Sequence, residues 1–320
     1  MPFEAKKKEF NVSVGVLEFG HGPAVQLGGE NVWPLYTFDG PLANPPRVGV
    51  EISDLGTEHW NVGLQGHYAN DDDIAGMAKR AGAMPGAEFV CLSFEGADPV
   101  GMDRNVEDCA ALAQAVSEAC PLPLCIAGSG NTEKDEELFQ RLAEALEGRN
   151  ILFLSATEDS YKAIGTGVAL AWGQKLAAES AVDINLAKQL NLLLSQLGIA
   201  NSAIAMNIGT AAAGYGFEYV ASTMERVKAA ALAQNDVALQ VPIITPVGKD
   251  AWGTKETLAS EEEYPLWGSS EERGIYMEVV TAAACLASGS NAVILRHPQS
   301  VSTIAEFIGL LTTDEGEGER

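Results

Sequence analysis

The sequence predicts an α/β protein with a (β/α)8 TIM barrel and a short N-terminal β-hairpin extension. From Arg47 onward, short apolar or β-branched runs alternate with longer helical patterns. Eight such units fit into about 265 residues, close to the ~250 residues typical of a TIM barrel. The strand candidates are almost continuously apolar, as in parallel sheets covered on both faces. A doubly wound open sheet is the alternative, but the first turn, EISDLGTEHW, lacks the G-x-G-x-x-G pattern of that fold.

Residues 1–46 form the predicted extension, residues 47–311 the barrel and residues 312–320 an acidic flexible tail. In the extension, NVSVGVLEF and PAVQLGG flank the turn GHGP, which indicates a hairpin. The predicted barrel strands are 47–53, 87–94, 122–128, 150–156, 176–182, 203–209, 241–247 and 291–297. The predicted helices are 71–82, 106–120, 133–148, 161–175, 185–198, 218–234, 271–289 and 301–311.

The helix ends carry local signals that agree with these boundaries. Thr132 precedes the acidic turn EKDEE and is the predicted N-cap of its helix. Gly148, Gly198 and Gly289 each follow a helical pattern and fit C-caps. The strand 176–182 is short and could also continue the helix before it.

The composition excludes several classes of partner. The chain has 320 residues, 47% of them hydrophobic, and a formal net charge of −24. A surface this acidic repels nucleic acid and anionic lipid, so neither is an expected partner. High acidity more often reflects a requirement for solubility than a specific function. No apolar run approaches the roughly 18 residues of a membrane span, and no apolar stretch follows MPFEAKKKEF. We therefore expect a cytoplasmic protein.

The five cysteines are predicted to be reduced core thiols. They form no C-x-x-C pair, their number is odd, and they lie in apolar runs such as FVCLSF and PLCIAG. This pattern does not fit disulfides, a zinc site or an iron–sulfur cluster.

In a TIM barrel, function lies at the carboxyl ends of the strands and in the loops that follow them. The candidates there are Glu51, Asp54, Glu95, Ser129, Asn131, Thr157, Glu158, Asp183, Asn185, Asn207, Gly209, Thr210, Thr245, Lys249, Arg296 and His297. This set is rich in amides and hydroxyls and poor in catalytic groups. No His, Cys and carboxylate cluster has metal-ligand spacing, and no G-x-S-x-G elbow is present. The sequence therefore assigns no catalytic and no metal-binding residue.

Some of these candidates, and the long loop after the seventh strand, have alternative interpretations. Glu51 and Asp54 could be an acid–base pair, but a helix cap or loop salt bridge is favoured. Arg296 requires a partner, which could be a phosphate, an amide carbonyl or an internal carboxylate. His297 could bind a ligand or cap the last helix. The long loop after the seventh strand carries Trp252, Tyr264 and Trp267. These aromatic residues could form a lid or protein interface, or a local cluster that anchors the loop.

The stretch GTAAAGYG has the two glycines of a phosphate-binding loop but not its chemistry. Tyr215 and Gly216 occupy the lysine and hydroxyl positions of G-x-x-x-x-G-K-[ST]. The small residues, including Gly209, Ala211 and Gly214, would instead allow a broad flat ligand to approach closely. A plain tight loop before the sixth helix is the alternative.

The segments VQLGGENVWPL, PPRVGVEISDL, MNIGTAAAGYGFEY and NAVILRHPQSV occur in an order and spacing that resembles a known family. This family is the small subunit of the corrinoid/iron–sulfur protein, related to the delta subunit of the acetyl-CoA decarbonylase/synthase complex. The resemblance covers essentially the whole chain, and its specificity lies in the order of the segments.

The resemblance implies a TIM barrel that pairs with a larger subunit in the reductive acetyl-CoA (Wood–Ljungdahl) pathway. The larger subunit would carry the [4Fe–4S] cluster and a corrinoid domain, with the cobalt corrinoid lying against this chain's barrel mouth. A methyl-tetrahydrofolate corrinoid methyltransferase would donate the methyl group, and acetyl-CoA synthase would receive it. This chain would hold and shield the corrinoid without bond chemistry of its own. The hairpin would close the bottom of the barrel or contact the larger subunit.

The corrinoid-binding candidates are then polar or small residues at strand ends. They are Asn207, Gly209, Thr210, Ala211, Gly214, Asn185, Ser129, Asn131, Lys249, Arg296 and His297. One alternative is a pterin-dependent corrinoid methyltransferase that grips pterin with Asp54, Asn131, Asp183 and Asn207. A phosphate-handling aldolase or isomerase is a weaker alternative, since Lys249 lies in a loop and not on a strand.

Overall fold

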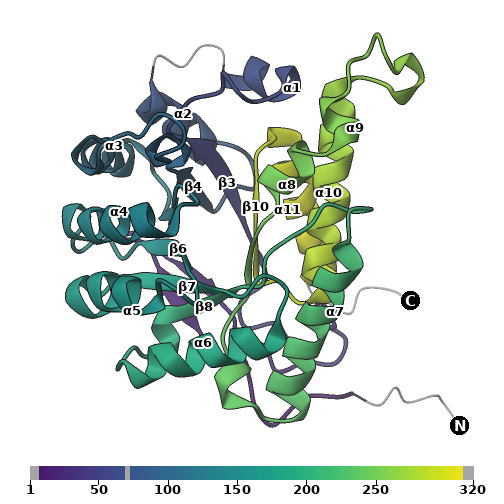
Figure 1. Cartoon of the computed structure of the whole chain (residues 1–320). Helices are drawn as coiled ribbons and strands as arrows, with labels where there is room; N and C mark the ends of the chain where they lie inside the picture. Colours follow the sequence, from purple (N-terminus) through teal and green to yellow (C-terminus); the bar gives the residue numbers. More distant parts are fainter. Residues whose placement is uncertain (1–6, 69–72, 313–320) are drawn as a thin grey trace, which may run out of the picture.

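The computed structural model describes residues 7–68 and 73–312 and contains a closed parallel barrel (Figure 1). Its eight-stranded sheet has the order β8-β7-β6-β5-β4-β3-β10-β9, and a parallel bridge between Met206 and Ile243 joins β8 to β9. The strands are β3 (Arg47–Ser53), β4 (Phe89–Ser93), β5 (Leu124–Ala127), β6 (Leu152–Ala156), β7 (Lys175–Glu179), β8 (Ile204–Asn207), β9 (Ile244–Pro246) and β10 (Ala292–Leu295). The predicted TIM-barrel fold is confirmed.

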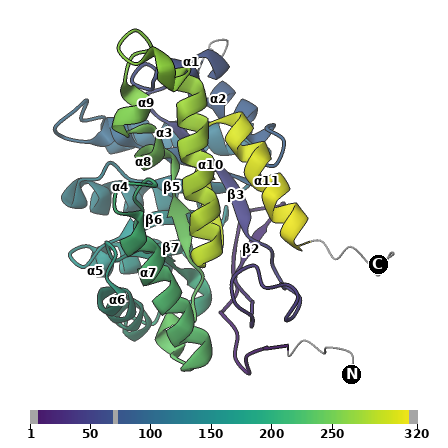
Figure 2. The same cartoon turned by 90° about the vertical axis from the view of Figure 1, so that its right-hand side faces the viewer.

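Helices surround the strands on the outside (Figure 2). The long ones are α2 (Ile74–Gly82), α3 (Val106–Ala119), α4 (Thr132–Ala145), α6 (Ile184–Gln196), α7 (Phe217–Lys228), α10 (Ser270–Ser288) and α11 (Pro298–Thr312). Short helical segments are α1 (Val62–Gln65), α5 (Tyr161–Ile164), α8 (Gly248–Trp252) and α9 (Lys255–Leu258), with α5 and α7 continuing into π-helical turns at Gly165–Leu170 and Ala229–Ala233. Short 3-10 turns lie at Gly66–Tyr68, Glu95–Ala97, Asn201–Ala203, Val237–Leu239 and Pro265–Trp267. Among the described residues, no helix is long and apolar enough to cross a membrane.

Most boundaries agree with the sequence to within a few residues. The helix predicted at 161–175 is shorter, because Lys175 already belongs to β7, and the C-cap of α4 is Leu146 and not Gly148. The N-cap of α4 is Asn131 and not Thr132, because the Asn131 side chain reaches forward and accepts a hydrogen bond from the Lys134 N–H at 3.1 Å. The strand 176–182 is confirmed as β7, but it begins one residue earlier and ends three residues earlier, since Ala181 and Val182 take positive φ in a turn. Residues 1–6, 71–72 and 313–320 of the predicted elements lie outside the described residues.

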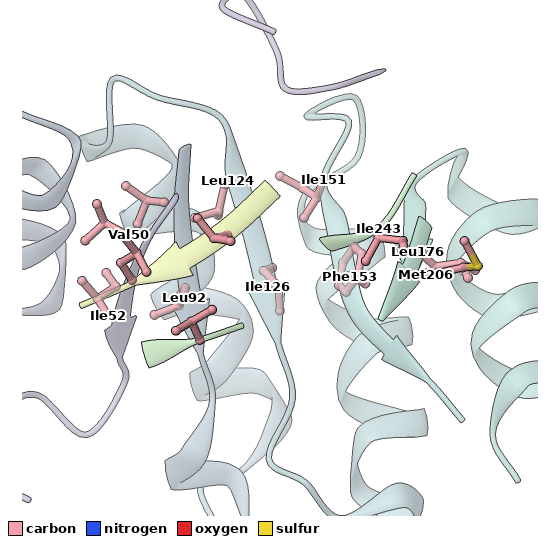
Figure 3. Close-up of a cluster of buried hydrophobic side chains, with 14 of the residues drawn as sticks. Val50, Ile52, Leu92, Leu124, Ile126, Ile151, Phe153, Leu176, Met206 and Ile243 are labelled. Carbon is pink, nitrogen blue, oxygen red and sulfur yellow. The ribbon is translucent and has the colours of Figure 1, made fainter. Parts of the chain in front are cut away.

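The barrel has two apolar cores. The larger core lies between the strands and the helices and includes Ile52, Leu92, Ile126, Phe153 and Met206 (Figure 3). It forms because side chains alternate in and out along each strand, and the outward ones meet the apolar stripes of the helices. All five cysteines are buried and free, as predicted.

The smaller core fills the lower half of the barrel and is closed by the hairpin. Strands β1 (Leu17–Phe19) and β2 (Val25–Leu27) pair antiparallel and bury Leu17, Phe19, Val25 and Leu27 against the inward residues of the barrel. The Phe19 ring packs edge-on against Phe89 at 5.4 Å between centroids. A Cβ at Gly49 would lie 2.3 Å from the same Phe89 ring, so only glycine fits there. Of the two roles considered for the hairpin, closure of the barrel bottom is confirmed.

Candidate functional site

A cavity of about 500 Å³ opens at the carboxyl ends of the barrel strands. Ser93, Ala127, Glu179, Asn207 and Pro246, the last residues of five different strands, lie in its wall. The lower half of the barrel is filled by the hairpin and the inner core. The cavity is therefore a hollow above a packed floor, at the end where TIM barrels carry their sites.

Carboxyl groups dominate the charge of this cavity. Glu51, Asp135, Glu179 and Asp250 contribute to its lining, whereas Lys249 is the cation among the lining residues. Burial raises the pKa of Asp135, Glu179 and Asp250 above the ordinary carboxyl values. A cavity with this lining favours N–H donors and cations and disfavours phosphate.

Asn207 is held in place at the centre of this wall. Its Nδ2 donates to Ser155 Oγ at 3.0 Å and to Glu179 Oε2 at 3.2 Å, and its Oδ1 accepts from the Gly209 N–H at 3.0 Å. Because its carboxamide is bonded on both sides, the residue presents a fixed polar surface to the cavity.

Arg296 has an internal carboxylate as its partner. Its Nε and one terminal nitrogen donate to the two carboxylate oxygens of Glu51 at 2.9 and 2.8 Å, and both side chains are about 7% exposed. The Trp60 ring lies 5.2 Å from the guanidinium carbon. Burial alone would raise the pKa of Glu95, but Arg296, Ser53 and Lys249 together lower it. Arg296 therefore fixes and neutralises Glu51, which lines the cavity.

Glu51 and Asp54 belong to separate ion pairs. Asp54 lies 3.1 Å from Arg104 Nε and accepts the Gly96 N–H at 2.8 Å. The favoured interpretation as a loop salt bridge is confirmed for Asp54, whereas Glu51 lies in β3 and forms a buried ion pair with Arg296.

His297 caps the last helix. Its Nδ1 accepts the Gln299 N–H at 3.1 Å, and its Nε2 lies 3.1 Å from Glu271. The ring stacks on Trp252 at 5.8 Å between centroids. Burial lowers the pKa of His297 despite the nearby Glu271. Of the two interpretations of this histidine, helix capping is confirmed.

The GTAAAGYG loop meets the cavity only at its start. Gly209, with φ +85°, and Thr210 line the cavity. The remainder turns toward neighbouring helices: the Ala213 N–H donates to Thr281 of α10 at 3.0 Å, and the Tyr215 hydroxyl donates to Glu256 of α9 at 2.5 Å.

The structure gathers part of the candidate set around the cavity. Asn207, Gly209, Thr210 and Lys249 line it, as Thr157 does. Ser129 and Asn131 flank the lining residue Gly130, but Ser129 donates to Asp135 at 2.7 Å and Asn131 caps α4. The candidates outside the lining are Asn185, which is exposed on α6, Ala211, Gly214, Arg296 and His297.

The sequence did not single out Asp135, Glu179 or Asp250. Glu179 carried a signal, because it is a charged residue inside the apolar run LAAESAV. Asp135 carried none, since it lies in a helix and reaches back to accept bonds from Ser129 and the Gly130 N–H. Among the described residues, no group of three or more His, Cys, Asp and Glu side chains is arranged to hold a metal.

Comparisons with solved structures show the fold. Dihydropteroate synthase from Xanthomonas albilineans superposes with a TM-score of 0.53 over 94% of this chain and 100% of the synthase, at 12% identity. A second structure of that enzyme, with 4-aminobenzoic acid, gives 0.54 over 93% and 99% at the same identity. At this identity the likeness concerns the barrel alone.

Comparisons with sequences show the family. The acetyl-CoA decarbonylase/synthase complex subunit delta of Archaeoglobus fulgidus is 30% identical over 97% of this chain and 71% of its own length. The protein of the same name from Methanothermobacter thermautotrophicus is 30% identical over 95% and 77%. The model of the CO dehydrogenase/acetyl-CoA synthase delta subunit family matches residues 11–296. The chain belongs to the CO dehydrogenase/acetyl-CoA synthase delta subunit family.

Proposed function

We propose that this chain is the small subunit of a corrinoid/iron–sulfur methyl carrier of the acetyl-CoA pathway. In this role it holds and shields one face of a cobalt corrinoid carried by a larger partner subunit, which also holds a [4Fe–4S] cluster. The observation that carries the proposal is the wide cavity at the barrel mouth, lined by carboxyl, amide and hydroxyl groups in a chain of this family.

The donor set fits the edge of a corrinoid. A corrinoid bears many carboxamides, each with N–H donors and a carbonyl acceptor. Glu179 and Asp135 can accept such N–H groups, while the exposed ammonium of Lys249 can donate to the carbonyls. The carboxyl-rich lining disfavours the phosphate of a corrinoid's nucleotide tail, so the tail is expected to lie away from this cavity.

In this proposal the chain positions its ligand and excludes water. The bound cobalt would supply the methyl transfer, accepting the group from a methyl-tetrahydrofolate corrinoid methyltransferase and passing it to acetyl-CoA synthase. Asn207, fixed by Ser155 and Glu179, would orient the ligand amides. The small residue Gly209 would leave room for the ring, and the packed floor beneath would keep water from that side.

Two observations disfavour the alternatives. A pterin-dependent methyltransferase would require free Asp54, Asn131 and Asp183, but Asp54 pairs with Arg104 and the other two cap α4 and α6. A phosphate-handling enzyme would require a cationic mouth, whereas the lining contains four carboxyl groups and, as its cation, Lys249, which pairs with Glu95.

The test is corrinoid uptake after co-expression with a larger subunit that carries a four-cysteine cluster motif. The wild-type pair should purify as a heterodimer with corrinoid absorbance. Thr210→Trp and Lys249→Trp, both at the cavity, should block uptake, and Lys188→Trp on the outer surface of α6 should not. Normal uptake by both cavity variants would place the corrinoid elsewhere. Methyl transfer by the isolated chain from methyl-tetrahydrofolate to free corrinoid would instead identify an enzyme.

A further inference from the structure

The connection between β9 and α10 carries a group of exposed apolar side chains. Leu258, Leu266 and Trp267 are 63%, 97% and 42% exposed, and we call these three residues the apolar knob. The connection projects beyond the helices at the upper right of Figure 1, on the side where α9 follows β9. Large apolar groups gathered on one projection are typical of an interaction site.

This projection is held rigidly and is not built as a mobile lid. Arg273, buried in α10, donates to the carbonyl oxygens of Gly268 and Ala259 and so ties both ends of the loop together. The Ser270 hydroxyl donates to the Thr257 carbonyl at 2.8 Å, and Ser269 begins α10 with a capping box. A preorganised apolar group loses little conformational entropy when it binds.

The aromatic residues of the loop divide into two roles. Trp252 is buried and stacks on His297, so it anchors the base of the loop. Tyr264 and Trp267 stack on each other at 4.1 Å between centroids, with Trp267 still exposed. The stacking fixes the Trp267 ring while leaving one part of it open to a partner, as in the aromatic anchors of protein interfaces.

The surroundings of the knob are acidic. Between Gly253 and Glu272 the chain has six glutamates and one lysine. Glu261, Glu262 and Glu263 are exposed on the loop itself. A second copy of this chain, with its formal charge of −24, would be repelled, whereas a surface rich in lysine and arginine would be attracted.

We propose that the apolar knob inserts into an apolar pocket rimmed by lysine and arginine side chains on the larger partner subunit. The inference rests on the proposed function for the identity of that partner. The same connection supplies Lys249 and Asp250 to the cavity wall. Docking at the knob would therefore fix the partner beside the barrel mouth.

The test measures the affinity of the purified chain for the purified larger subunit. Leu266→Asp and Trp267→Ala should each weaken binding by about 30-fold or more, the loss typical of a hot-spot residue. Val237→Asp, an exposed apolar position at the opposite end of the barrel, is the matched control and should bind normally. Unchanged unfolding midpoints would show that the variants are folded.

A charge variant tests the basic rim separately. Glu262→Lys combined with Glu263→Lys should slow association several-fold at low salt and reduce its dependence on ionic strength. If wild type binds and the knob variants bind within twofold of it, the knob is not the docking surface. An unchanged association rate in the charge variant would overturn the basic rim. If wild type does not bind at all, both this proposal and the proposed function fail.

Discussion

Replacing Lys228 by methionine is expected to destabilise the fold by about 3–5 kcal/mol, the usual cost of breaking a buried ion pair. Lys228 lies at the end of α7 with a side chain only 2% exposed. Its ammonium donates to Glu30 at 2.6 Å and to Asn291 at 2.9 Å. Asn291 also donates to Glu30 at 2.9 Å, so three distant segments meet at one point.

The magnitude follows from the geometry of this pair. At 2.6 Å and an effective dielectric constant of about 20, the Coulomb attraction is about 6 kcal/mol. The variant no longer buries the ammonium, which offsets part of this loss, and methionine fills nearly the same volume. The remaining loss of stability is chiefly the cost of leaving the Glu30 carboxylate buried without its cation.

Urea unfolding followed by tryptophan fluorescence measures the effect. The double variant Lys228→Met with Glu30→Gln removes both charges and should recover at least about 2 kcal/mol relative to the single lysine variant. The reasoning is refuted if Lys228→Met lies within about 1 kcal/mol of wild type, or if the double-mutant cycle shows no coupling between the two positions.

Three further predictions concern the barrel floor, a helix cap and the cavity. Phe19→Ala should lower the free energy of unfolding in urea by about 3–5 kcal/mol, because it leaves a void against Phe89. A loss below about 1 kcal/mol would mean that the hairpin does not close the barrel. Asn131→Ala should lower the free energy of unfolding by about 1 kcal/mol in the same assay, and Thr132→Ala should lower it clearly less. A larger loss for Thr132→Ala than for Asn131→Ala would identify Thr132 as the N-cap of α4. Burial raises the pKa of Glu179 above that of an ordinary glutamate. The folded protein therefore loses stability as the pH rises and the buried carboxyl has to ionise. Glu179→Gln should therefore be more stable relative to wild type at pH 8 than at pH 4, and a pH-independent difference in unfolding free energy would contradict this.

The sequence by itself determined the succession of elements. Hydrophobic periodicity and the Gly and Asn signals at element ends are local, and the eight strand–helix units followed from them. Parallel strands with short connections then leave few topologies, and the closed barrel is the one that matches this length. The sequence also predicted a strand at 176–182, where β7 (Lys175–Glu179) lies, although this segment could have continued the preceding helix.

The tertiary structure alone decided which polar groups meet. Arg296 pairs with Glu51, 245 residues away, and nothing local to either residue distinguishes that partner from a bound phosphate. Asp135 reaches back from a helix toward the cavity, and His297 turns to cap α11. The physical reason is that backbone conformation responds to near neighbours in the chain. Side-chain pairing, and with it the charge of the cavity, depends on distances set only when the barrel closes.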